Sequence, residues 1–323
     1  MPGREHQIPE RWGLAEKRRA VQATRAARFS VVYHMLGLRA EAHADGTLDI
    51  TVASPGGGGC PGPRDEGSYA VRQIKLTIHH LYADMMNLYG DRGNVIAIKK
   101  RAEWRGIPVE VVDVGLEETI KPTPSADLFL FGGGQDREQA LLAEDLSGTK
   151  GADLRAIVED GGVVLGVCGG YQLMGHYYET PEGEKLPGVG IFDMYTRPRR
   201  PDEARLIGNV LVQIRAPEGG AVHEIVGFEN HGGRTELGDE AEPLGEVIVG
   251  YGNNGEDGTE GARRLNAYGT YLHGSLLPKN PWLTDQLILN ALRRVDENVE
   301  LEPLDDAAER SAFTSVANRL TDQ

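Results

Sequence analysis

The sequence is poor in cysteine and lacks the features of a membrane or nucleic-acid-binding protein. Its 323 residues include two cysteines, Cys60 and Cys168, without a C-x-x-C spacing, which argues against a disulfide framework and a zinc knuckle. The cysteines and histidines show no ligand spacing, so we predict no metal site. The formal charge of −15 argues against nucleic acid and anionic membranes as main partners. No apolar run approaches the roughly 18–20 residues of a membrane helix, and the N-terminus has no apolar signal segment. We therefore expect a cytoplasmic protein without a transmembrane segment.

Composition divides the chain into three parts. Residues 1–72 contain the basic segment "EKRRAVQATRAARF" and a Gly/Pro-rich linker over 54–63, which includes Cys60. We predict a weakly ordered extension there, with an amphipathic arm for a partner as the alternative. Residues 73–296 are expected to form the main domain, and 297–323 an acidic tail with a short surface helix.

The main domain has the rhythm of an α/β fold. Alternating strands and helices predict parallel β-α-β units with right-handed crossovers. Three strand-like stretches between about 188 and 251 predict an additional antiparallel segment. The expected strands of the central sheet are 74–81, 107–114, 126–134, 161–168 and 265–274, and the expected helices are 93–106, 136–146, 151–161 and 282–295.

The stretch "GVCGG" places Cys168 in the spacing G-x-C-x-G, at the end of a strand and the start of a helix. This is the thiol counterpart of the G-x-S-x-G nucleophile elbow, in which glycines remove clashes around a strained central residue. A following helix would favour the thiolate, and the Gly169 N–H would help to bind an oxyanion. The alternative is a buried structural cysteine in a Gly-rich turn.

A second oxyanion donor is expected in "FLFGGGQD", where glycines at a strand end expose backbone N–H groups. Gly133 and Gly134 are the candidates. A phosphate-binding turn is the alternative, but neither G-x-x-x-x-G-K-[ST] nor G-x-G-x-x-G is present, which argues against a nucleotide site.

The general base is expected among the histidines of the main domain. His231 and His273 are the two candidates, and His273 is favoured because it ends a strand of the same sheet and precedes a glycine. Paired with Cys168, it would support nucleophilic catalysis through a thioester.

Together these segments resemble the class I, triad-type glutamine amidotransferases of the branch that includes cobyric acid synthase. Within that branch the chain is most similar to the glutaminase subunits of lipid II isoglutaminyl synthases, through "GFENHGGRT" and "LHGSLLPKN". The resemblance runs from about residue 74 to 292. It implies a flavodoxin-like α/β domain with a mostly parallel central sheet.

The resemblance also implies a function and site residues. The chain would hydrolyse L-glutamine, with Cys168 as nucleophile and His273 as its partner. A substrate-binding arginine maps onto Arg205, although the longer preceding loop leaves Arg199 or Arg200 as substitutes. Gln172 is a second candidate substrate contact, or else an ordinary polar residue at a helix start. Ammonia would pass to a Mur-ligase-like partner that uses ATP to amidate the D-glutamate of lipid II, with no cofactor on this chain.

One departure from the family pattern bears on the histidine. Many class I enzymes place a glutamate two residues after it, where this chain has Ser275. This leaves the imidazole without an obvious orienting carboxylate on this chain, and we hypothesise that the partner ligase supplies one. Three alternatives remain open: an amidotransferase for corrinoid side chains, a degenerate binding module, and a stand-alone cysteine hydrolase of γ-glutamyl substrates.

Overall fold

A computed structural model describes residues 38–42, 48–52, 74–87, 91–134, 136–216 and 220–321. The chain divides into two units, Met1–Gln73 and Ile74–Gln323. In the first unit, β1 (Leu38–Ala42) and β2 (Leu48–Val52) pair as a two-stranded antiparallel sheet. The predicted basic segment, the linker and Cys60 lie outside the described residues.

The second unit is built on a six-stranded sheet. The strands lie in the order β15 (Ala262–Arg264), β16 (Ala267–Thr270), β6 (Val163–Val167), β5 (Ala126–Phe131), β3 (Leu76–Leu81) and β4 (Val109–Val114). All are parallel except β15, which pairs antiparallel with β16. In chain order, the five parallel strands lie 2-1-3-4-5, the flavodoxin-like arrangement. The predicted fold class is confirmed.

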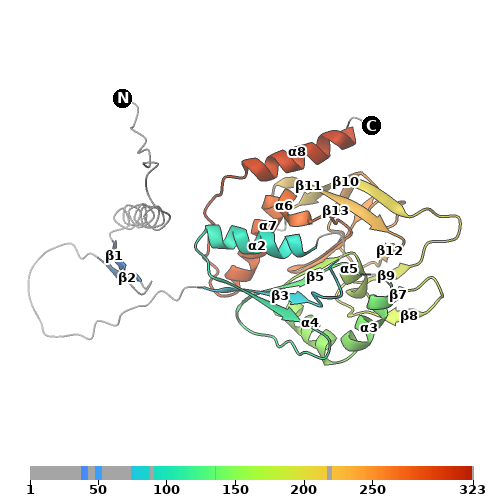
Figure 1. Ribbon diagram of the computed structural model, residues 1–323, viewed down its shortest axis with the longest axis horizontal. Coiled ribbons are helices and arrows are strands. Elements are labelled where there is room, and N and C mark those ends of the chain that lie inside the picture. Colours follow the sequence, from blue (N-terminus) through green and yellow to red (C-terminus); the bar gives the residue numbers. More distant parts are fainter. Residues whose placement is uncertain are drawn as a thin grey trace, which may run out of the picture. The chain divides into compact units, whose positions relative to one another are not determined.

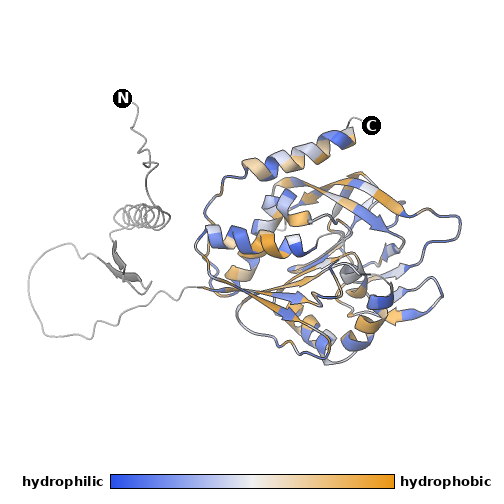
Figure 2. Cartoon of the chain, in the orientation of Figure 1, coloured by the Kyte–Doolittle hydropathy of each residue, from blue (hydrophilic) through white to orange (hydrophobic). Residues whose placement is uncertain are grey.

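Helices cover both faces of this sheet. Figure 1 shows α2 (Arg92–Trp104) and α7 (Pro281–Arg293) on one side, and α3 (Asp136–Leu146) and α4 (Thr149–Glu159) on the other. Figure 2 shows the central strands as mainly hydrophobic, as expected for a parallel sheet that is buried on both faces. Every residue of β5 and β6 is buried. The four helices expected beside the sheet are present within a few residues of their predicted bounds.

The predicted antiparallel segment forms two further sheets. One has the order β11 (Val222–His231), β10 (Leu206–Arg215), β13 (Gly245–Val249) and β14 (Thr259–Glu260). The other has the order β12 (Arg234–Leu237), β9 (Met194–Arg197), β7 (Tyr177–Glu179) and β8 (Lys185–Pro187). Within them, β7 and β9 pair in parallel and the other pairs are antiparallel.

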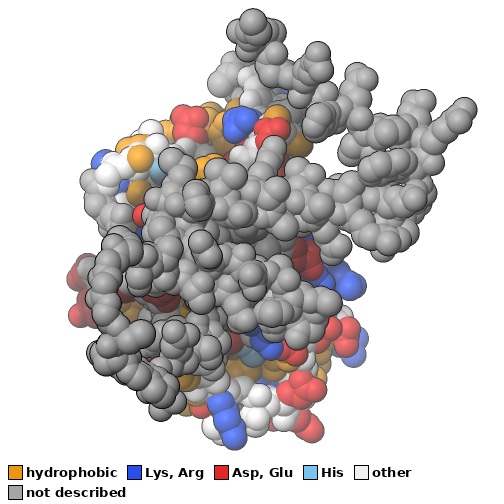
Figure 3. Space-filling model, turned by 90° about the vertical axis from the view of Figure 1, so that its left-hand side faces the viewer, with side chains coloured by type: hydrophobic (Ala, Val, Ile, Leu, Met, Phe, Trp, Pro, Cys, Tyr) orange, Lys and Arg blue, Asp and Glu red, His pale blue; other side chains and the backbone are white. Residues whose placement is uncertain are grey.

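The C-terminal helix α8 (Ala307–Thr321) packs against β10 and β11. Its Leu320 joins Leu211 and Val226 in a small apolar cluster, separate from the main core. The predicted surface helix is therefore docked on the domain. Among the described residues, no helix is both long and apolar enough to cross a bilayer. Figure 3 shows acidic and basic side chains interspersed over the described part of one face.

Candidate active site

Cys168 lies in a strained turn between β6 and the short helix α5 (Gly169–Leu173). Its backbone angles, φ 50° and ψ −106°, lie outside the regions that side-chain-bearing residues usually adopt. The turn is fixed because the Cys168 N–H donates to the Thr270 carbonyl at 2.8 Å. Strain of this kind gathers at functional sites, where the surrounding structure imposes it. The predicted elbow is present.

The glycines around the cysteine are needed for packing against neighbouring backbone. A Cβ on Gly170 would lie 2.5 Å from the Phe131 carbonyl oxygen. A Cβ on Gly166 would lie 2.4 Å from the Met174 sulfur and 3.1 Å from the Tyr171 nitrogen. The tight turn thus presses against the end of β5 and against its own helix. That helix has only five residues, so its dipole contributes less to thiolate stabilisation than the sequence interpretation assumed.

His273 follows β16 and is fully buried. Its N–H donates to the Phe228 carbonyl at 2.8 Å, and its own carbonyl accepts from the Phe228 N–H at 3.3 Å. This pair of bonds ties the segment after β16 to β11. His273 and Cys168 therefore follow neighbouring parallel strands at their carboxyl ends, where ligands bind in sheets of this type.

Asp91 supplies the acidic group that the sequence interpretation lacked. Its carboxylate lies with Oδ1 3.5 Å from His273 Nδ1, and both side chains are buried. The sequence pattern offered no obvious carboxylate for this position, and the structure places Asp91 beside the imidazole. Asp91 immediately precedes α2, near the start of the domain, whereas His273 lies near its end. No local spacing in the sequence therefore connects the two residues.

A local signal marks Asp91 as unusual. It stands at the N-cap position of α2, where an aspartate normally accepts a hydrogen bond from the first helical turn. No such bond is made, and Oδ2 instead accepts the Gly133 N–H at 2.7 Å. The Asp91 side chain thus contacts Gly133 and His273 in place of the N–H groups of its own helix.

The three side chains converge on Gly133. A Cβ there would lie 2.8 Å from His273 Cε1, 3.2 Å from Asp91 Oδ2 and 3.4 Å from Cys168 Cβ. Burial disfavours the imidazolium, but Cys168 and Asp91 outweigh it and raise the pKa of His273 to about 10. A protonated histidine beside the sulfur attracts a thiolate, which is the nucleophilic form of cysteine.

The predicted oxyanion donors differ in their availability. The Gly133 N–H is engaged with Asp91, which argues against a role in oxyanion binding. Among the described residues, the N–H groups of Gly134 and Gly169 have no hydrogen-bond acceptor. The Gly134 nitrogen lies 3.0 Å from where a Cβ on Gly169 would be, so the two glycines are adjacent. They form the candidate pair of donors.

Arg205 lies at the start of β10, exposed, beside the glycine pair 232–233. Its Nε and Nη2 donate to Asn230 Oδ1 at 3.1 and 3.0 Å, which holds the guanidinium in place. A Cβ on Gly232 would lie 3.3 Å from its Nη1. Arg200, by contrast, is paired with Glu203. Arg199, the other alternative, donates to the Glu203 carbonyl oxygen at 2.9 Å. Both alternatives thus contact Glu203, whereas Arg205 contacts Asn230.

Gln172 is buried one turn after the nucleophile, and its N–H donates to the Cys168 carbonyl. Its Oε1 accepts from Gln139 Nε2 at 2.7 Å, and its Nε2 donates to the Tyr271 hydroxyl at 3.1 Å. Both ends of the amide are thus bonded within the protein. This geometry favours the structural alternative for Gln172 over direct substrate contact.

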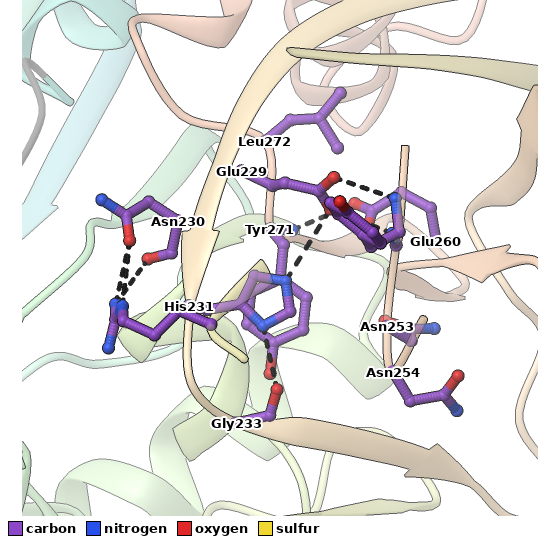
Figure 4. A network of polar contacts seen from close by, with 12 residues as sticks. Glu229, Asn230, His231, Gly233, Asn253, Asn254, Glu260, Tyr271 and Leu272 are labelled. Atoms are coloured by element: carbon purple, nitrogen blue, oxygen red, sulfur yellow. Dashed lines mark hydrogen bonds and ion pairs between the residues drawn. The ribbon is translucent and has the colours of Figure 1, made fainter. Parts of the chain in front are cut away.

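The other candidate base, His231, belongs to a network of polar contacts that includes Glu229, Tyr271 and Gly233 (Figure 4). Its ring stacks on Tyr271 with centroids 3.6 Å apart, and Nδ1 lies 2.9 Å from the Gly233 carbonyl oxygen. Burial lowers the pKa of His231. Glu229 lies nearby and accepts the N–H groups of Tyr251 and Gly252. His231 is therefore held by Tyr271 and Gly233, and His273 is the histidine that interacts with Cys168.

Comparison with known proteins places this arrangement in context. Residues 77–281 match the CobB/CobQ-like glutamine amidotransferase domain. The chain is 43% identical over 251 residues to the lipid II isoglutaminyl synthase (glutamine-hydrolyzing) subunit GatD of Staphylococcus aureus, covering 77% of this chain and 98% of GatD. It is 37% identical over 242 residues to the same subunit of Streptococcus pneumoniae, covering 75% and 89% of the two chains.

More distant similarity extends to one longer curated protein and to a solved structure. Cobyric acid synthase of Rhodobacter capsulatus is 39% identical over 127 residues, which cover 38% of this chain and 24% of that protein. The solved structure of PurLQS from Thermotoga maritima matches with a TM-score of 0.49 and 14% identity, over 70% of this chain and 100% of that chain.

Proposed function

The chain belongs to the CobB/CobQ-like glutamine amidotransferase family, and on that premise we propose that it is the glutaminase subunit of a lipid II isoglutaminyl synthase. The observation that carries this proposal is the buried arrangement of Cys168, His273 and Asp91 around Gly133. The two GatD relatives are matched over nearly their whole length, whereas cobyric acid synthase is matched over a quarter. This difference favours lipid II amidation over corrinoid amidation.

In the proposed reaction, the Cys168 sulfur attacks the side-chain carboxamide carbon of L-glutamine. The carbonyl oxygen gains negative charge and is bound by the N–H groups of Gly134 and Gly169. His273 gives its proton to the leaving nitrogen, so that ammonia departs and a γ-glutamyl thioester remains.

Hydrolysis of the thioester completes the cycle. His273 then takes a proton from the attacking water, the C–S bond breaks and glutamate is released. Asp91 holds the imidazole by its Nδ1 side throughout, so Nε2 is the nitrogen that exchanges protons.

Arg205 is the proposed anchor for the α-carboxylate of glutamine. A guanidinium forms two parallel hydrogen bonds to a carboxylate, and this one is held by Asn230 with Nη1 toward Gly232. Gly233, the next residue, packs against the Gln172 amide, which links the arginine to the nucleophile turn.

The released ammonia would be used by a second chain. We propose a Mur-ligase-like partner of the MurT type, which binds ATP and Mg²⁺ and amidates the D-glutamate of lipid II to D-isoglutamine. The test is to incubate the two-chain complex with ATP, lipid II and glutamine labelled with ¹⁵N in its amide. The expected result is transfer of the label to the stem peptide, which Cys168→Ala should abolish. Added unlabelled ammonium should then restore amidation of the stem peptide without the label. Label transfer that survives Cys168→Ala would overturn the proposal.

A further inference from the structure

Gln139 places a side-chain amide directly beside the candidate oxyanion donors. It lies on the first turns of α3 and is 1% exposed. Its Nε2 lies 2.5 Å from the position that a Cβ on Gly169 would occupy, and the Gly134 nitrogen lies 3.0 Å from the same point. The residue after the nucleophile is therefore flanked by a backbone N–H and by the carboxamide of Gln139.

The oxygen of this carboxamide has no hydrogen-bond partner. Nε2 donates to Gln172 Oε1 at 2.7 Å, which fixes the orientation of the group. Among the described residues, nothing donates to Gln139 Oε1, although the atom is buried. Burying an acceptor without a donor lowers stability, so a native protein retains such an acceptor only for a reason.

The unpaired groups at this point complement one particular functional group. Two N–H donors, on Gly134 and Gly169, lie beside the carboxamide group of Gln139, whose oxygen is buried and has no donor among the described residues. A primary carboxamide offers the converse set, one acceptor oxygen and an NH₂ donor. A carboxylate offers only acceptors at neutral pH and would bring its second oxygen against Gln139 Oε1.

We propose that Gln139 is a specificity-determining residue that accepts a hydrogen bond from the carboxamide nitrogen of L-glutamine. This inference rests on the proposed glutaminase function and deepens it. Because sites that hydrogen-bond a substrate group reject analogues lacking that group, Gln139 favours glutamine over glutamate, the reaction product. The same acceptor would weaken retention of glutamate after the thioester is hydrolysed.

The test measures substrate and product affinity separately. Calorimetric titration of glutamine and glutamate into the full-length Cys168→Ala chain avoids turnover. In that background, Gln139→Met keeps the side-chain length and replaces the amide oxygen by a weak acceptor. The affinity for glutamine should fall roughly tenfold, while the affinity for glutamate is unchanged or rises. The preference for glutamine over glutamate should therefore fall by about tenfold or more.

Two further variants separate this role from a structural one. Gln139→Glu retains an acceptor but loses the donor to Gln172 Oε1, so both affinities should fall while the preference for glutamine is kept. Tyr271→Phe removes the hydroxyl bonded to Gln172 but leaves Gln139 Oε1 in place, so both affinities should change by the same factor. Equal loss of both affinities in Gln139→Met would overturn the inference, while glutamine turnover by the unmodified chain would leave the proposed function standing.

Discussion

The carboxylate of Asp91 lies 3.5 Å from Nδ1 of His273, and its other oxygen accepts the Gly133 N–H. Two residues far apart in the chain thereby form a buried acid–imidazole pair at the carboxyl ends of two strands. Cys168, His273 and Asp91 thus lie together within one chain, and Asp91 is a candidate for the group that orients the imidazole.

Replacing Asp91 by asparagine should lower kcat/KM for glutamine by roughly a hundredfold or more, because the imidazole loses its orienting charge. The same carboxylate raises the pKa of His273, so the alkaline limb of the pH–rate profile should move to lower pH. Rate profiles of both proteins between pH 6 and pH 10 provide the measurement, with the range chosen from the reference and raised pKa values. A reduced rate with an unmoved limb would show that Asp91 acts on folding alone.

Gly133→Ala should abolish activity without preventing folding. The new methyl group would meet His273, Asp91 and Cys168 together, and a displacement of about 1 Å at such a site costs on the order of a hundredfold in rate. Gly208→Ala is the matched control, because a Cβ at that position of β10 has no heavy atom within 4 Å. Circular dichroism and glutamate release should be measured on both variants. Comparable activity in the two would contradict the convergence on Gly133.

Arg205→Ala should raise KM for glutamine roughly tenfold or more with little change in kcat, because the contact holds the α-carboxylate equally before and during reaction. Arg200→Ala is the control, since that guanidinium is already paired with Glu203, and its KM should stay near that of the unmodified chain. Steady-state kinetics decides between them. A larger KM increase in the control would assign the carboxylate to Arg200 instead.

Glu260 should make the fold less stable as pH rises through weakly acidic values. Burial, with the nearby charge of Glu229, raises its pKa from 4.5 to about 7, against hydrogen bonds from Thr270 and Tyr271. Between those two values the folded chain keeps a proton that the unfolded chain has lost. Its contribution to stability is therefore full below pH 4.5, declines up to about pH 7 and is constant above, by about 3 kcal/mol in all.

Glu260→Gln tests this sign directly, because glutamine keeps an oxygen to accept from Thr270 and Tyr271 without a titrating proton. Urea unfolding of both proteins across pH 4.5–7.5, a range set by the reference and raised pKa values, should show the variant gaining relative stability as pH rises. Parallel stability curves would mean that folding does not raise the pKa of Glu260.

Local sequence patterns were sufficient for the sheet and for two members of the site. Cys168 is marked by the glycines that its strained turn requires, and His273 by its place at the end of a strand. Asp91 was not predicted, because its contact with His273 depends on the strand order 2-1-3-4-5. That order brings together chain segments that no sequence spacing links. Asp91 also accepts the Gly133 N–H, which the sequence pattern alone had suggested as a free oxyanion donor.

The proposed specificity role of Gln139 could not be predicted for a similar reason. Its position on an amphipathic helix is typical of an ordinary half-buried polar residue. Only the packing of α3 against the nucleophile turn shows that its amide lies beside Gly169. Predictions from sequence therefore identify residues in special backbone conformations, and miss residues that matter through long-range contact.

The role of Cys168 as the nucleophile is tested most directly by measuring glutamate release from L-glutamine. The unmodified chain and Cys168→Ala should each be measured with and without the candidate ligase partner. We expect glutamate release that is lost on substitution of Cys168, whether or not the partner is present. Release that persists in Cys168→Ala would contradict the assignment of Cys168 as the nucleophile and, with it, the proposed glutaminase reaction.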